Sequence, residues 1–302
     1  MKALRRTNLL LCAALLLWFL ADAANVRRAA SDALKLCAAS VIPALFPFLV
    51  VTGLLISLGF GALVSPTLAP LMSLYSLPGS AGSAVLLGLL GGFPVGARTA
   101  ADLYRLGLLT KKEAERLLTF CNNANPAFFI SVLGNGVFHS TRAGAWLLLI
   151  HILAALLTGL AFRGRGDAPR TRPPALRDTP PEFFPAFVEA VGNAAPAMLR
   201  VCAFVVFFSV LVRPLRGWNS PAAAPCVGLL ELFSLTPMLT PDARGFVLAS
   251  LCAGWGGASA LAQTAAVLEN TGLSMRPCLR GKAVQAALSG LLAAALCATV
   301  TL

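Results

Sequence analysis

Long apolar runs with few charges are the feature that most limits what this chain can fold into. Such runs cover residues 143–162, 186–212 and 244–268, among others. A helix needs about 20 mostly apolar residues to cross a bilayer, and only helices or closed barrels satisfy their backbone groups there. The sequence therefore predicts an all-α, polytopic integral membrane protein with roughly eight membrane segments, some of them re-entrant.

The distribution of charge agrees with a membrane protein. Charged residues make up only 12% of the chain, and 24 Lys and Arg against 12 Asp and Glu give a net charge of +12. The basic residues fall mostly in the short gaps between apolar runs, as they do in cytoplasmic loops. Anionic lipid head groups attract such segments. We therefore expect the lipid bilayer as a partner, and we do not expect nucleic acid.

Motifs for a metal, a cofactor or catalysis are missing from the sequence. The eight cysteines form no CxxC pair, and in apolar runs cysteine behaves as a small hydrophobic residue. The two histidines, His139 and His151, belong to no HExxH motif, and neither a GxSxG motif nor a P-loop occurs. The sequence predicts no metal site, no cofactor and no enzymatic activity.

An N-terminal apolar run and a polar stretch in the middle set the expected units of the chain. The run at residues 9–21 follows a basic start and is either a cleaved signal peptide or a retained first membrane helix, and retention is our prediction. A polar stretch with five arginines and five prolines is predicted to be an extended cytoplasmic linker. The expected units are an N-terminal helix or signal-like segment (1–30), a first repeat with a following helix (31–162), the linker (163–182) and a second repeat (183–302).

The two halves share an ordered pattern. "RTAADLYRLGL" (98–108) aligns with "QTAAVLENTGL" (263–273), with Thr-Ala-Ala, Leu and Gly-Leu at the same spacing. The glycine pairs upstream of these motifs also match. This pattern indicates an internal duplication. The alternative is coincidence between two alanine-rich stretches.

Glycine and proline interrupt the apolar runs at matching places in the two halves. A broken helix exposes the N–H groups of its second part, and these can bind an anionic or carbonyl oxygen. Short, interrupted apolar runs at corresponding positions predict discontinuous or re-entrant helices at a binding site. Tight helix packing through small residues is the alternative. The predicted backbone breaks are Gly91, Gly92, Pro94, Gly96, Gly256 and Gly257.

Amide and hydroxyl side chains near these breaks are the candidate binding residues. A buried amide is costly unless it is hydrogen-bonded, and amides recognise neutral polar groups through one donor and one acceptor. Capping of a helix that begins near Pro126 is the alternative role for the asparagines. The predicted solute-binding residues are Asn122, Asn123, Asn125, Gln263, Thr264, Ser259 and Thr99. Arg98 and Asp102 are instead expected to pair at the membrane surface.

These motifs resemble one family. The stretch "GGFPVGARTAADLYRLGLLTKKEAERLLTFCNNANPAF" (91–128) and the later "GWGGASALAQTAAVLENTGL" are similar to the YlbJ-type sporulation integral membrane proteins, which carry a nucleoside-recognition or Gate domain. The resemblance covers most of the chain. It implies two Gate-type repeats, the inner membrane of an endospore-forming bacterium and a role in forming the spore cortex.

The resemblance also implies what the site would do. The family's motif positions fall on Gly92, Pro94, Gly96, Asn122, Asn123, Trp255, Gly256, Gly257 and Gln263. They suggest a small polar, nucleoside-like solute that is transported or sensed. A non-transporting scaffold for other sporulation membrane proteins is the alternative. The expected protein partners are further copies of this chain or other sporulation membrane proteins. Phe93 stands where the resemblance implies tyrosine, so a hydroxyl is lost there.

Overall fold

The computed structural model describes residues 2–164, 182–218 and 220–299. These residues form helices and loops and contain no strand, which confirms the predicted all-α fold. Most of the predicted linker (163–182) lies outside the described residues. The elements are α1 (Lys2–Ala21), α2 (Ala23–Leu36), η1 (Cys37–Val41), α3 (Ile42–Ser57), α4 (Phe60–Leu74), α5 (Ala81–Gly91), α6 (Val95–Arg105), α7 (Lys111–Leu117), η2 (Phe128–Val137), α8 (Thr141–Ala161), α9 (Phe183–Arg216), α10 (Ala223–Leu230), α11 (Leu232–Leu235), η3 (Thr236–Met238), α12 (Ala243–Trp255), α13 (Gly257–Leu268) and α14 (Arg276–Thr299).

Several of these helices can cross a bilayer. In the described part of the chain, α8, α9, α14 and the α12–α13 pair are long and apolar enough. The number of spans rises to six if the bent pairs α1–α2 and α3–α4 each count as one, and α5 and η2 are shorter apolar helices. The described residues thus provide four to six spans, fewer than the roughly eight predicted segments, because α5 and η2 are too short to cross a bilayer. The protein is thus a multi-pass membrane protein, as predicted.

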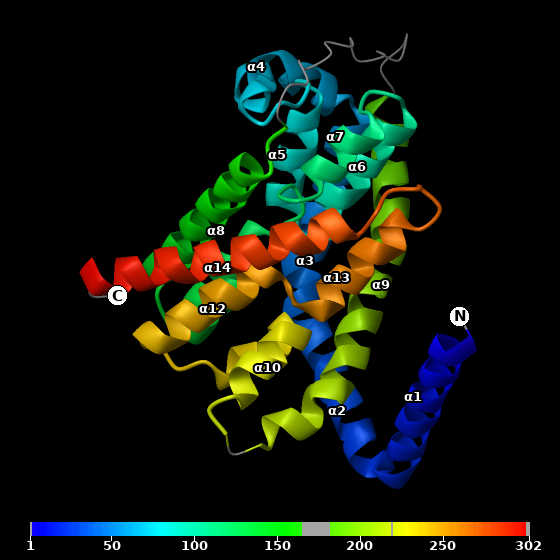
Figure 1. Ribbon diagram of the computed structural model, residues 1–302, viewed down its shortest axis with the longest axis vertical. Coiled ribbons are helices and arrows are strands. Elements are labelled where there is room, and N and C mark those ends of the chain that lie inside the picture. Colours follow the sequence, from blue (N-terminus) through cyan, green and yellow to red (C-terminus); the bar gives the residue numbers. More distant parts are fainter. Residues whose placement is uncertain (1, 165–181, 219, 300–302) are drawn as a thin grey trace.

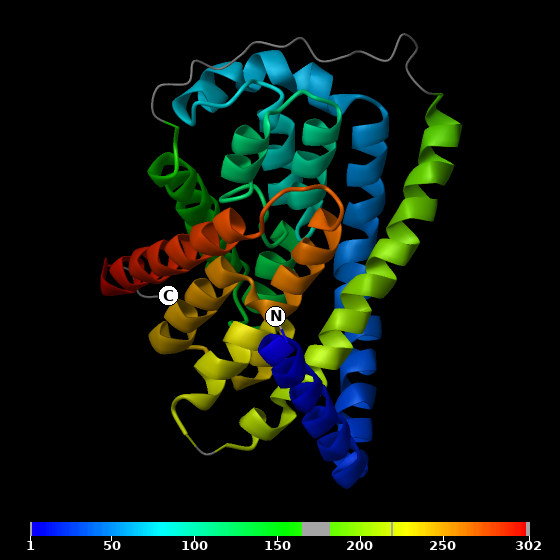
Figure 2. The ribbon, with the colours of Figure 1, turned by 45° about the vertical axis from the view of Figure 1, so that its right-hand side comes forward.

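Two groups of helices enclose a middle layer. The long helices α3 and α9 pack side by side, while α8, α12 and α14 pack together on the other side (Figures 1 and 2). Helices α5, α6 and α13 lie between these groups. Helix α1 bends away from α2 by 94° and leaves leucines such as Leu10 and Leu17 exposed, as lipid contact requires.

The first glycine break reverses the direction of the chain. A Cβ atom built on Gly88 would lie 2.8 Å from the Cα atom of Gly96. In a continuous helix, residues eight apart are about 12 Å apart along the axis. Helices α5 and α6 therefore fold back on each other as a re-entrant hairpin. Gly92, with φ of +80°, and Pro94 lie at its tip, whereas Gly91 ends α5 and Gly96 lies inside α6.

The second glycine break is much narrower. Helix α12 ends at Trp255 and α13 begins at Gly257, so only Gly256 interrupts them. Gly256 and Gly257 have φ values of +89° and +81°, which only glycine adopts easily. The two helices still count as one span of 26 residues. The likeness predicted between the two breaks is therefore local, because one break forms a hairpin tip and the other a short interruption.

Polar residues at the surface cap a helix and form ion pairs. Asp242 caps α12 by accepting the Gly245 N–H at 2.8 Å, and the Thr240 hydroxyl donates to the same carboxylate. These bonds hold the pKa of Asp242 below its usual value. Asp102 lies 4.0 Å from Arg98 in the expected exposed ion pair, although it lies closer to Arg105, at 3.3 Å.

The hairpin depends on two glycines. A Cβ atom on Gly88 or Gly96 would overlap the carbonyl oxygen of Cys121, which is backbone and cannot move aside. We expect Gly88→Ala to destabilise the protein by about 1–3 kcal/mol, as overpacking does. Thermal unfolding in detergent measures this. Gly192→Ala in α9 is the control, because that Cβ atom would meet nothing within 4 Å. Equal melting temperatures for the two variants would contradict the close contact.

Candidate functional site

A small cavity lies where the two breaks meet. Its volume is about 50 Å³, and its lining includes Gly92 and Phe93 from the first break and Gly256 from the second. Apolar side chains of α3, α9 and α11 complete the wall. A Cβ atom on Gly256 would lie 2.6 Å from the Cζ atom of Phe93, so the glycine leaves room for that ring. The hairpin tip is thus seated against the second break.

Polar atoms without partners point to this cavity as a binding site. Asn125 Nδ2, Ser259 Oγ and Gln263 Oε1 are buried, line the cavity and have no hydrogen-bond partner among the described residues. Nearly all buried polar atoms in proteins are hydrogen-bonded, because an unpaired one costs about 1–3 kcal/mol. The cavity has room for roughly three or four water molecules. Three of the predicted binding residues are therefore gathered around a space that suits a polar occupant.

Glu231 adds a carboxylate to the same wall. It lies between α10 and α11 and is 2% exposed. Its two carboxylate oxygens accept the backbone N–H groups of Phe233, at 3.2 Å, and Ser234, at 2.5 Å. The residue caps α11 and keeps acceptor capacity toward the cavity. Sequence analysis did not select it, although an acidic residue inside an apolar run is a recognised signal of function.

Asn122 and Thr264 do not line the cavity and are hydrogen-bonded to each other. Asn122 Nδ2 donates to Thr264 Oγ1 at 2.7 Å, and Asn122 Oδ1 accepts the Ala97 N–H at 3.4 Å. Thr264 Oγ1 in turn donates to the carbonyl of Ala260. These groups are satisfied within the protein, so both residues join the two halves instead of lining the cavity.

The other predicted residues have separate places. Asn125 Oδ1 accepts the Phe128 N–H at 2.9 Å, which is the capping role considered as the alternative. Asn125 Nδ2 has no hydrogen-bond partner among the described residues. Thr99 donates to the Val95 carbonyl within α6 and does not line the cavity. Asn123 belongs to a different network, which contains a buried lysine.

That lysine was missed by sequence analysis. Lys282 of α14 is completely buried, and its Nζ atom donates to Gln285 Oε1 at 2.8 Å and to Asn123 Oδ1 at 3.4 Å. The signal was present in the sequence, because Lys282 and Gln285 lie three residues apart at the start of the last apolar run. His151 of α8 is close by, and the Gln285 side chain donates to its backbone carbonyl at 3.5 Å.

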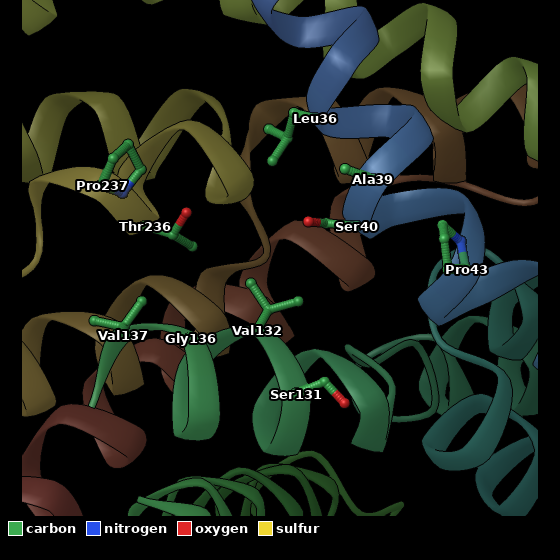
Figure 3. Close-up of a pocket in the computed structure, with 10 residues that line it drawn as sticks. All are labelled: Leu36, Ala39, Ser40, Pro43, Ser131, Val132, Gly136, Val137, Thr236 and Pro237. Atoms are coloured by element: carbon green, nitrogen blue, oxygen red, sulfur yellow. The ribbon is translucent and has the colours of Figure 1, made fainter. Parts of the chain in front are cut away.

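A second and larger space, of about 550 Å³, is called the outer hollow below, and the small cavity at the two breaks is called the inner cavity. Three irregular segments line the outer hollow: η1 and the start of α3, the π-helix η2, and η3 (Figure 3). Hydroxyl groups of Ser40, Ser131 and Thr236 are spaced around a mostly apolar wall (Figure 3). Pi-helical turns often occur at functional sites. Several lining residues are exposed, so the hollow opens to the outside of the protein.

Two chain segments take part in both spaces and carry an aromatic pair on the inner side. Phe128 and Phe233 line the inner cavity, and about one turn later Ser131 and Thr236 line the outer hollow. The rings of Phe128 and Phe233 meet edge to face with centroids 5.1 Å apart. The same segments therefore form both spaces, with an aromatic pair on the inner side.

Metal ligands do not gather at either space. In the part of the chain that the structure describes, no group of three or more His, Cys, Asp and Glu is placed to hold a metal ion. The eight cysteines are free thiols. The predicted absence of a metal site and a cofactor stays a prediction.

Comparisons with known proteins agree with the resemblance seen in the sequence. Residues 38–140 match the family model described as Gate, nucleoside recognition. The chain is 27% identical over 322 aligned residues to the sporulation integral membrane protein YlbJ of Bacillus subtilis, covering 91% of this chain and 79% of that protein. No solved structure matches. The predicted resemblance is confirmed, whereas a second Gate-type repeat and the other predicted unit boundaries stay predictions.

The contribution of the Asn122–Thr264 hydrogen bond to the stability of the protein can be measured. Thr264→Val keeps the shape of the side chain but leaves Asn122 Nδ2 without a partner, so we expect a loss of about 1–3 kcal/mol. Thr99→Val is the matched control, because that hydroxyl bonds only within its own helix. Thermal unfolding of both variants checks the difference. The link between the halves would be refuted by equal stabilities.

Proposed function

We propose that this membrane protein binds a small polar solute in the cavity between the two breaks, and transports or senses it during spore formation. The observation that carries the proposal is the convergence of three unpartnered polar atoms, those of Asn125, Ser259 and Gln263, on one buried space. The role in sporulation rests on the relative's name. Formation of the spore cortex is the finer expectation for that role.

The chemistry of the cavity limits the solute. Asn125 Nδ2 is a donor, Gln263 Oε1 is an acceptor and Ser259 Oγ can be either. With the free acceptor capacity of Glu231, the wall is matched by a solute that both donates and accepts hydrogen bonds. A neutral polar molecule, or a polar part of a larger one, fits this set.

The outer hollow supports a route to the cavity. Its volume of about 550 Å³ lies within the usual range of small-molecule pockets. The inner cavity, at about 50 Å³, holds only a small group. We infer that a solute first occupies the hollow and reaches the polar cavity when Phe128 and Phe233 separate. A nucleoside-sized molecule fits the hollow by volume, which agrees with the description of the Gate family.

The rival function is a membrane scaffold without a solute. In a scaffold, the same glycines would allow close packing and the same asparagines would cap helices. The hydrogen bonds of Asn122 and of Asn125 Oδ1 suit that role. The gathering of three such atoms around one cavity favours the solute, because a scaffold gains nothing from that arrangement. An enzymatic role is not part of the proposal.

Substitution of the unpartnered groups separates these functions. We expect Gln263→Leu and Ser259→Ala to leave the melting temperature unchanged or higher, because each removes a buried polar atom without a partner. We expect both to weaken solute binding about tenfold, as a loss of roughly 1.4 kcal/mol does, and therefore to lower the count of heat-resistant spores. The test uses a Bacillus subtilis strain in which this chain replaces its YlbJ relative and supports sporulation.

Ser80→Ala is the matched control. The Ser80 hydroxyl is also buried and unpartnered among the described residues, but it does not line the cavity. This variant should sporulate normally. Normal sporulation of all three variants would favour the scaffold.

The aromatic pair can be tested independently. Phe233→Ala should open the path from the outer hollow, so a cysteine at position 259 (Ser259→Cys) should react faster with a small water-soluble methanethiosulfonate reagent. We expect an increase of about tenfold or more, equal to roughly 1.4 kcal/mol of barrier. Mass spectrometry of peptides distinguishes this cysteine from the native ones. Phe138→Ala, in an aromatic contact with Phe246, is the control. An unchanged rate after Phe233→Ala argues against the route.

A further inference from the structure

Lys282 is a buried cation in an unusual setting. It is 0% exposed and lies inside the membrane-spanning helix α14. No Asp or Glu of the described residues lies within ion-pair distance of its Nζ atom. Moving an unpaired charge out of water is expensive, so such a residue is a candidate for function. Lys282 does not line the inner cavity, so the proposed solute site does not explain it.

The groups around Nζ match an ammonium ion. Gln285 Oε1 accepts at 2.8 Å and Asn123 Oδ1 accepts at 3.4 Å. The ring of Phe93 presents its face, with the centroid 4.9 Å from Nζ. An ammonium group has three N–H donors, and an aromatic face attracts a cation. Two oxygens and one ring therefore complement the charged form.

The neutral amine fits the same surroundings poorly. Its lone pair would need a donor, yet the nearby amide N–H groups have other partners. Asn123 Nδ2 donates to the Phe120 carbonyl at 2.7 Å, and Gln285 Nε2 donates to Asn123 Oδ1 at 2.9 Å. His151 Nε2 accepts the Ala124 N–H at 3.3 Å, so this nitrogen is not a donor, and His151 Nδ1 makes no hydrogen bond to Nζ or to any other described group. Both amides thus aim their oxygens at Nζ.

The backbone is shaped to bring these groups together. A Cβ atom on Gly281 would overlap the carbonyl of Thr119, so glycine lets α14 approach the loop that carries Asn123. The nearest titratable groups besides His151 are the thiols of Cys121 and Cys278. Both are buried, and neither forms an ion pair in the described residues.

We propose that Asn123, Gln285 and the face of Phe93 form a site for a monovalent cation, and that the chain fills this site with its own Lys282 ammonium. The tethered cation holds the Phe93 ring against Gly256 and places a positive charge beside the hairpin tip. No dissolved cation is then needed to hold the two breaks together. Phe93 also lines the solute cavity, but Asn123, Lys282 and Gln285 do not, and the inference does not depend on the occupant of that cavity.

The test is to empty the site and offer it a free cation. Lys282→Ala, as the full chain in detergent, should melt lower than the wild type in choline chloride. Ammonium or potassium chloride at the same concentration should raise its melting temperature by at least about 2 °C, as ligand binding does. Wild type should melt equally in all three salts. Lys282→Met, which fills the space without charge, should melt low and show no difference between salts.

Two outcomes would overturn the proposal. The first is an equal response of Lys282→Ala and Lys282→Met to the small cations. The second is a melting temperature of Lys282→Met equal to that of wild type. Since the readout is stability, loss of solute binding at the inner cavity would leave this conclusion untouched.

A second variant decides the question if Lys282→Ala cannot be purified. Phe93→Leu removes the aromatic face and keeps an apolar side chain. It should lower the melting temperature more in the wild-type background than in the Lys282→Met background, because the ring attracts only the charged ammonium. Equal losses in the two backgrounds would refute the proposal.

Discussion

The contact of Phe93 with Gly256 is the interaction on which the rest of the site depends. The hydrocarbon core of a bilayer offers no water to satisfy a broken helix, so an interruption must be enclosed by protein. Here one interruption encloses the other. The ring at the hairpin tip fills the space that a side chain on Gly256 would occupy. The inner cavity, the Asn122–Thr264 bond and the network of Lys282 are arranged around this contact.

The loop that carries three asparagines shows how packing and binding share one segment. Asn125 caps η2, Asn122 links the two halves, and Asn123 accepts from Lys282 and Gln285. Most of the hydrogen-bonding capacity of these amides is therefore used inside the protein. What remains unused is one N–H₂ group of Asn125, and it lies at the cavity. A binding site of this kind is built from the capacity that the structural bonds leave over.

Phe93 also explains how the site tolerates the loss of a hydroxyl that the resemblance implied. A phenyl ring needs no hydrogen-bond partner, and its two faces and edges can serve different neighbours. One face lies toward Lys282, and the ring reaches Gly256 and the cavity wall. The residue therefore connects the buried cation with the meeting point of the two breaks.

The sequence by itself determined the class of the protein and the location of its interruptions. Apolar runs without charges specify membrane helices because the bilayer excludes unpaired polar groups, and Gly92 and Gly256 stand out because they interrupt such runs. Tertiary structure alone decided that the first interruption forms a hairpin and the second a one-residue break, since local sequence does not say which helices pack against which. It also decided which amides are used up in structural bonds, placed Glu231 on the wall of the inner cavity, and brought Lys282 and Gln285 of α14 to Asn123. Their roles depend on neighbours far away in the chain, and those neighbours are set only when the helices pack.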